Sequence, residues 1–419
     1  MRILQGEAAE TYVRSLERRG SRLEEIEPAV RKIVDDVRSN GDRALLEYAR
    51  KFDGLEATQD VRVDESELKA AWKEAPRELR AAMRVAERNI RRFCEWQKPK
   101  QWRRSADGAT LGQLVRPLDS AGCYVPGGRF PLVSTLFMTV IPAQVAGVKN
   151  IRVVSPKPSK EVLAAAGMLG VKEFYRVGGA QAIAALAYGT ETVGRVDKIV
   201  GPGNLYVTAA KKLVSFDCAI DMLAGPTEGM IVSNRGTPAF IAVDLLAQAE
   251  HDPETLVTFV TTSKRLADQV SREVEEGGRG RPPLQSNAIA AQAIASRGAI
   301  LIAQSRTQAF DWANRIAPEH ITVEKGDLTR VQNAGSVFVG DYSAQAAGDY
   351  ASGPNHVLPT AGAARFRGGL SVMDFVKLIT VQDLSRRGLA KISQSIVTLA
   401  ETEGLKAHAD SIRVRCARA

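Results

Sequence analysis

Histidine is scarce in this sequence, and so is cysteine. Each occurs only four times among the 419 residues. Because imidazole is the side chain that changes charge near neutral pH, proton-transfer chemistry has few candidate positions. The cysteines form no CxxC pair, which argues against a zinc ribbon or a disulfide framework and predicts a reducing, cytoplasmic setting. The histidines are His251, His320, His356 and His408.

Long apolar runs are also missing. No stretch approaches the roughly 20 apolar residues that a bilayer-spanning helix needs. The segment from Met1 to Gly20 carries charges throughout and lacks the apolar centre of a secretory signal. We therefore expect no membrane association. Apolar residues at 44% and charged residues at 25% are the balance of a globular protein.

The net charge is +9, from 57 basic and 48 acidic side chains, and a basic protein can bind nucleic acid or an anionic cofactor. The densest basic stretch runs from Arg84 to Arg104 and includes Trp96 and Trp102. A nucleic-acid surface is one interpretation, and a solvated helix face is the other. We favour the helix face and expect no nucleic-acid partner, because no nucleic-acid motif accompanies the arginines.

Strands and helices are predicted to alternate from Ala121 onward, which is typical of parallel sheets with helical crossovers. We expect two α/β units, each with its own sheet, and an amphipathic helical tail over 373–408. The predicted strands are 123–125, 151–154, 174–177, 198–200, 230–232, 256–260, 299–303, 320–323 and 336–339. The first four crossover helices are expected at 134–146, 159–169, 180–188 and 204–214.

Three glycine-bearing turns follow predicted strands in the first unit, at Tyr124–Gly128, Val177–Gln181 and Gly201–Asn204. Ligands bind at this edge of open parallel sheets, and helix N-termini favour phosphate. The chain contains no GxGxxG fingerprint. Each turn alone fits a plain connection, whereas the three together favour a nucleotide.

Polar residues in the second unit offer further candidates. Gln248 and His251 lie on one face of a predicted helix and could share a metal or form an ordinary polar face. Glu319 and His320, at the mouth of a predicted strand, suit general acid–base chemistry if both reach one pocket. The remaining candidates occupy a turn-rich loop and the tail; they are Asp349, His356, Glu403 and His408. Taken alone, Asp349 fits an ordinary turn residue, and Glu403 and His408 fit solvated tail residues.

Taken together and in order, these motifs resemble the histidinol dehydrogenase family from about Val30 to Arg415. The matching stretches are Tyr-Val-Pro-Gly-Gly, Gly-Gly-Ala-Gln-Ala, Gly-Pro-Gly-Asn, Ala-Gly-Pro-Thr-Glu, Gln-Ala-Glu-His, Ala-Pro-Glu-His, Gly-Asp-Tyr-Ala-Ser-Gly-Pro-Asn-His and Glu-Gly-Leu-Lys-Ala-His. The resemblance implies oxidation of L-histidinol to L-histidine through a bound aldehyde, with NAD and one Zn²⁺ per subunit. A paralogous alcohol dehydrogenase acting on another amino-alcohol or diol is the alternative.

The resemblance also implies roles for individual residues. Glu319 and His320 would be the catalytic pair. The implied zinc ligands are Gln248, His251, Asp349 and His408. All four ligands and His320 would contact the substrate, together with Thr227, His356 and Glu403. The implied NAD contacts are Tyr124, Gln181 and Asn204.

The fold implied by the resemblance is α/β, with two Rossmann-like domains that have parallel sheets but lack GxGxxG, plus helical terminal extensions. We expect an N-terminal arm at 1–22, one domain from 23–118 and 229–371, the NAD-binding domain at 119–228, and a dimerising tail at 372–419. Family members are homodimers, and the active site is expected to be shared between subunits. Departures from the family pattern are Thr227 in place of serine, Gln345 in place of glutamate, and the unusual stretch Gly128–Leu132.

Overall fold

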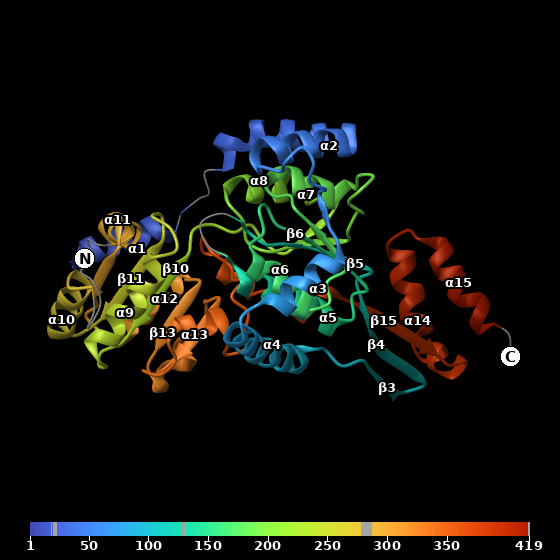
Figure 1. Ribbon diagram of the computed structural model, residues 1–419. Helices are drawn as coiled ribbons and strands as arrows, with labels where there is room; N and C mark the ends of the chain where they lie inside the picture. Colours follow the sequence, from blue (N-terminus) through green and yellow to red (C-terminus); the bar gives the residue numbers. More distant parts are fainter. Residues whose placement is uncertain (18, 20–22, 128–130, 278–286, 418–419) are drawn as a thin grey trace.

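Two six-stranded sheets and one three-stranded sheet make up the computed structural model (Figure 1). The structure describes residues 1–17, 19, 23–127, 131–277 and 287–417. The predicted turn at Gly128 and most of the predicted loop at 275–283 lie outside the described residues. The expected fold class is confirmed, because strands and helices alternate through two separate parallel sheets.

Sheet B has the strand order β2-β7-β6-β5-β8-β9, and all of its pairings are parallel except that of β2 with β7. Its central strand is buried along its whole length, as expected when helices cover both faces. The strands are β2 (Arg62–Val63), β5 (Ser120–Tyr124), β6 (Asn150–Val154), β7 (Glu173–Tyr175), β8 (Lys198–Val200) and β9 (Ala219–Ile220). The crossover helices are α5 (Val133–Ala146), α6 (Lys160–Met168), α7 (Gly179–Tyr188) and α8 (Leu205–Val214).

Sheet A is fully parallel, with the order β1-β12-β11-β10-β13-β14. The strands are β1 (Arg2–Gln5), β10 (Glu228–Val232), β11 (Leu256–Thr261), β12 (Ala299–Ile302), β13 (His320–Val323) and β14 (Ser336–Val339). Its helices are α1 (Gly6–Glu17), α9 (Pro238–Ala249), α10 (Lys264–Glu275), α11 (Ala288–Arg297), α12 (Arg306–Ile316) and α13 (Gln345–Tyr350). As the sequence predicts, Pro238 is the first residue of α9.

The N-terminal part of the chain is distributed differently from our expectation. Residues 2–17 are not an arm, because β1 pairs with β12 and α1 packs on α12. The helix α2 (Leu23–Phe52) packs on α7 and α8, and α3 (Glu65–Glu74) packs on α6. These helices and β2 therefore belong with sheet B and not, as predicted, with 229–371. Their buried apolar residues belong to the two core clusters that surround sheet B.

The C-terminal region also differs from the prediction. It begins with a strand, β15 (Val376–Leu384), which pairs with β4 (Ala109–Pro117), and β4 pairs in turn with β3 (Trp102–Ala106). Val376 and Ile379 thus lie on a strand and not on the predicted helical stripe. The β-branched residues in this segment favour the strand, and pairing with β4 satisfies its backbone. Two helices follow, α14 (Arg386–Thr402) and α15 (Lys406–Cys416).

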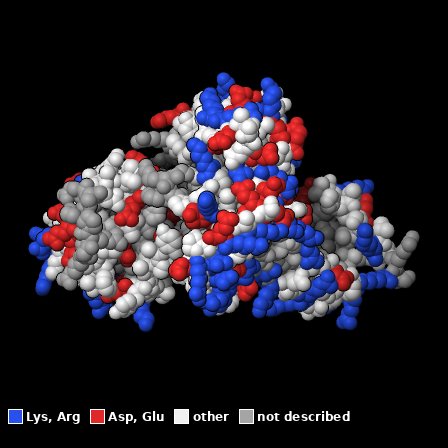
Figure 2. Space-filling view, viewed as in Figure 1, with Lys and Arg blue, Asp and Glu red and all other residues white. Residues whose placement is uncertain are grey.

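Helices among the described residues are all too short or too polar to cross a membrane. The basic stretch around Arg84 lies on α4 (Arg77–Gln97), whose buried face is Met83, Ala86, Ile90 and Cys94. Figure 2 shows the Lys and Arg side chains gathered over this helix. The arginines thus form the solvated side of an amphipathic helix, which is the interpretation that we favoured.

Candidate active site

The carboxyl edge of sheet B carries the expected NAD contacts. Tyr124 is the last residue of β5 and is buried. Gln181 lies in the first turn of α7, and Asn204 caps α8 by accepting the Val207 N–H. Two helix N-termini therefore meet the three side chains at one edge, an arrangement that favours the phosphates of a nucleotide.

Gly201, at the end of β8, shows why this edge needs glycine. Its φ is 114°, and a Cβ there would lie 2.1 Å from the Tyr124 carbonyl oxygen. Its N–H donates to Asp221 Oδ2 (2.7 Å), and its carbonyl accepts from Lys211 Nζ (3.0 Å). Asp221 and Lys211 also form a buried ion pair. The Asp221–Lys211 pair thus holds both the N–H and the carbonyl group of Gly201.

The catalytic candidates lie at the amino edge of sheet A. Thr227 directly precedes β10, and Glu319 and His320 stand where β13 begins. Glu319 Oε2 accepts the Glu228 N–H (3.0 Å) and lies 3.7 Å from His320 Nδ1. His320 Nε2 lies 3.3 Å from Asp349 Oδ1. Glu319, His320 and Asp349 therefore form one buried cluster, and the two members of the pair lie close enough together for acid–base chemistry.

His320 is held between two carboxylates and stacks on Phe338. Burial alone lowers the pKa of His320, but Glu319 and Asp349 outweigh it and raise the pKa to about 10. Burial raises the pKa of Asp349, and its contact with His320 more than offsets this, so that the net direction is downward. The two carboxylates therefore favour the protonated, cationic form of His320.

His356 connects the two sheets. Its Nδ1 lies 2.7 Å from the Asp349 carbonyl oxygen, and its Nε2 lies 3.4 Å from the Thr135 hydroxyl on α5. Asn355 donates to the Met138 carbonyl of the same helix (2.7 Å). Burial lowers the pKa of His356, which favours neutral imidazole. The loop after α13 thereby brings the amino edge of sheet A to the carboxyl edge of sheet B.

Gln248 has the properties of an incomplete metal ligand. It is 1% exposed at the end of α9, and neither Oε1 nor Nε2 has a hydrogen-bond partner. A buried amide without partners is costly and calls for an explanation. His251 Nδ1 lies 3.1 Å from the Gln248 carbonyl oxygen. This contact orients the ring and leaves Nε2 for a ligand. Together with Asp349 on α13, which packs on α9, these donors fit Zn²⁺.

Glu403 and His408 do not join this group. Both are exposed, at the end of α14 and on α15. Figure 1 shows α15 at the right end of the molecule, with α9 and α13 toward the left. Consistently, no group of three His, Cys, Asp or Glu side chains within the described ranges is arranged to hold a metal.

Two features of the site were missed or left undecided by the sequence. Glu228 is buried, forms an ion pair with Arg19 and accepts the Ala361 N–H; its place beside Thr227 in Ala-Gly-Pro-Thr-Glu was the available signal. Gln345 is buried and donates to the Met230 carbonyl and the Thr322 hydroxyl, both at 3.1 Å. An amide is therefore suited to this position, and it adds no charge near Asp349.

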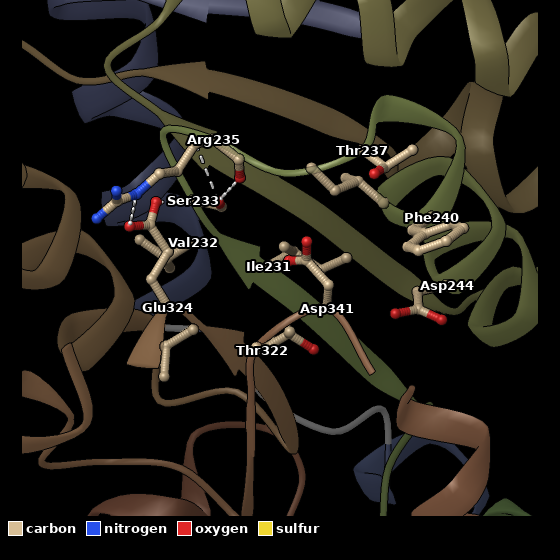
Figure 3. A pocket seen from close by; sticks show the side chains of 13 residues that line it. Ile231, Val232, Ser233, Arg235, Thr237, Phe240, Asp244, Thr322, Glu324 and Asp341 are labelled. Carbon is tan, nitrogen blue, oxygen red and sulfur yellow. Dashed lines mark hydrogen bonds and ion pairs between the residues drawn. The ribbon is translucent and has the colours of Figure 1, made fainter. Parts of the chain in front are cut away.

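A separate pocket lies at the carboxyl edge of sheet A (Figure 3). It sits at the opposite ends of β10 and β13 from Glu319 and His320. Glu324 projects there and accepts the Asn234 N–H (2.7 Å), the Ser233 hydroxyl (3.1 Å) and the Arg235 guanidinium (2.9 Å). This edge therefore already contains an anion of its own.

Glycine-bearing turns on one sheet lie near a histidine–carboxylate cluster with metal donors on another, an arrangement that suits an α/β dehydrogenase. A family model, histidinol dehydrogenase, matches residues 16–416. The chain is 46% identical to a histidinol dehydrogenase from Geobacter sulfurreducens, covering 93% of both proteins. It is 44% identical to one from Methanosarcina mazei, covering 98% of this chain and 96% of that protein.

A solved structure agrees with these sequence matches. Histidinol dehydrogenase from Elizabethkingia anophelis superposes with a TM-score of 0.93 at 36% identity, covering 99% of this chain and 98% of that one. The chain belongs to the histidinol dehydrogenase family. It is thus an oxidoreductase of histidine biosynthesis, in a family that uses NAD and Zn²⁺.

Proposed function

We propose that this chain oxidises L-histidinol to L-histidine in two NAD-dependent steps, at a site completed by the tail of a second subunit. A site shared between subunits is supported by one observation: within one chain, His408 lies far from Gln248, His251 and Asp349. Within one chain, α15 packs mainly on α14. Leu399 and Leu405 on this hairpin are 63% and 43% exposed, and a partner subunit would cover them.

The protein residues divide the work by position. When bound, Zn²⁺ would hold the substrate in place and NAD would accept the electrons. His320 takes the hydroxyl proton in each oxidation, and Glu319, 3.7 Å from its ring nitrogen, activates water for the second. A Zn²⁺ held by Asp349 would offset the charge of one of the two carboxylates beside His320, which would favour the neutral imidazole that a general base needs.

Substrate recognition is assigned to the polar groups around this pair. Thr227 and His356 contact the substrate from the body of one subunit, and Glu403 and His408 from the tail of the other. Tyr124, Gln181 and Asn204 contact NAD. Enclosure between the two sheets keeps the intermediate aldehyde from solvent. We also propose a cytoplasmic location, supported by cysteines that are free in the described part of the chain.

Subunit mixing tests the shared site. His408→Ala and His320→Ala proteins, each inactive alone, are unfolded together and refolded. If the tail acts on the partner, a hybrid dimer has one intact site and one doubly defective site, and random pairing restores about a quarter of wild-type activity. Complete turnover yields about two NADH per histidinol, because alcohol to acid is a four-electron oxidation.

Two outcomes contradict the proposal. An inactive mixture in which hybrid dimers are detected by mass refutes the shared site. An endpoint of one NADH with free aldehyde in wild-type protein refutes the two-step reaction. A mixture of wild-type and His408→Ala protein, refolded in the same way, is the control for refolding yield.

A further inference from the structure

Asp53 lies beneath the turn that opens α7, although it comes from a distant part of the chain. It directly follows α2, and Gly54 then turns the backbone with φ at 63°. This positive φ favours glycine, because an L side chain would be strained there. Asp53 is 7% exposed. The packing of α2 on α7 thus places the Asp53 carboxylate at the carboxyl edge of sheet B.

The Asp53 carboxylate makes two contacts with this turn. Its Oδ2 accepts the Gly178 N–H (2.9 Å) and the Gln181 Nε2 (3.0 Å). Gly178 caps the N-terminus of α7. The next backbone group, the Gly179 N–H, donates to the Tyr124 hydroxyl (3.2 Å). Asp53 therefore holds both the backbone and one side chain of the proposed NAD site.

These contacts determine which hydrogen-bonding groups remain for a ligand. An ionised carboxylate only accepts hydrogen bonds, so the Gln181 amide must turn Nε2 toward Asp53. Its Oε1 then lies beside Gly179, where a Cβ would come within 2.7 Å of it. Tyr124 accepts from Gly179 and so keeps its own proton to donate. One acceptor and one donor are thereby presented at the edge of the turn.

We propose that Asp53 is a positioning residue for NAD, acting through Gln181 and the Gly178–Gly179 turn. The inference rests on the proposed function, in which Gln181 and Tyr124 contact NAD. Asp53 itself is buried behind the turn and touches neither cofactor nor substrate in this arrangement. Its loss would free the Gln181 amide to rotate and leave the Gly178 N–H without an acceptor.

The test compares Asp53→Ala and Asp53→Asn with wild-type protein. Asparagine keeps an oxygen that can accept both hydrogen bonds, whereas alanine has none. Asp53→Ala is expected to raise the KM and Kd for NAD about tenfold or more, since it removes the acceptor of both hydrogen bonds and leaves the Gly178 N–H unsatisfied. The kcat and the KM for histidinol stay within about twofold. Asp53→Asn stays close to wild type.

Asp36→Ala is the matched control. Asp36 is another carboxylate of α2 and accepts from Tyr48 and Asn40 within the same helix. This change tests the helix without touching the turn, so NAD binding should be unchanged. Thermal unfolding without NAD is measured for all variants, and Asp53→Asn keeps the test valid if Asp53→Ala folds poorly.

Three outcomes are decisive. If wild-type protein binds no NAD, the proposed function fails and this inference with it. If wild-type protein binds NAD and Asp53→Ala binds it equally tightly, only this inference is overturned. A loss in NAD affinity for Asp36→Ala as large as that for Asp53→Ala would assign the effect to α2 packing and would also overturn this inference.

Discussion

Sheets A and B share one topology but are used at opposite edges. In each, a central strand, β10 or β5, has two later strands on one side and two on the other, and an N-terminal strand extends the sheet. The crevice where strand order reverses is the usual ligand site of such sheets. In sheet B this crevice carries the NAD candidates. In sheet A it is the pocket of Figure 3, and the reactive residues lie at the far edge.

The side chains at the two crevices explain the difference. Sheet B ends in glycine turns whose supporting carboxylates, Asp53 and Asp221, lie behind the backbone. In sheet A, Glu324 occupies the crevice itself and takes the N–H at Asn234 that an anionic ligand would need. Glu324 thus takes the place of an anionic ligand in the crevice of sheet A, whereas the crevice of sheet B remains available for NAD.

The largest effect is expected at the amino edge of sheet A. His320→Ala removes the proposed base, and kcat should fall by about 10²–10⁴-fold. Asp244→Asn, at the opposite edge of the same sheet, is the control and should leave kcat unchanged. NADH formation gives the rate, and circular dichroism checks the fold. Comparable losses of kcat in the two variants would contradict the assignment of catalysis to the amino edge of sheet A.

The second prediction concerns the support of sheet B. Lys211→Met leaves Asp221 buried without its partner, and the free energy of unfolding should fall by about 3–5 kcal/mol. Lys391→Met breaks an exposed pair with Asp107 and should change stability little. Urea unfolding measures both. If Lys211→Met lowers the free energy of unfolding no more than Lys391→Met does, the buried pair does not hold the Gly201 turn.

The smallest effect is expected for Glu324→Gln in sheet A. Burial raises the pKa of Glu324, but the Asn234 N–H and its other donors bring it down to about 2. Because the folded-state pKa is below the ordinary 4.5, the carboxylate stabilises the fold above about pH 4.5, and this contribution is lost as the pH falls toward 2.

Its partial exposure reduces that contribution to about 1–2 kcal/mol at pH 7. The difference in unfolding free energy between wild-type and Glu324→Gln protein should therefore shrink between pH 5 and pH 3, in urea titrations at each pH. A difference that is constant with pH would show that the charge of Glu324 does not contribute.

Most of the local structure could be predicted from the sequence. The strands β5 to β8 and β10 to β14 follow apolar runs bounded by glycine, proline or polar residues, and such runs suit sheets covered on both faces. The two-residue strand β9 (Ala219–Ile220) was not predicted. The sequence also identified Gln248, His251 and Asp349 as candidate metal donors. It placed Glu319 and His320 together at the start of a predicted strand. In β15, by contrast, the spacing of apolar residues suggested a helix, and pairing with β4 made it a strand.

The sequence by itself determined most of the strands and helices of the two large sheets, and which side chains can bind a metal or move a proton, because both depend on neighbouring residues and side-chain chemistry. Only the tertiary structure decided that α2 covers sheet B, that Asp53 lies under the Gly178 turn, that Glu324 closes one crevice, and that His408 stands apart from Gln248. Contacts between residues more than a hundred positions apart depend on how whole layers pack, and no local pattern encodes that packing.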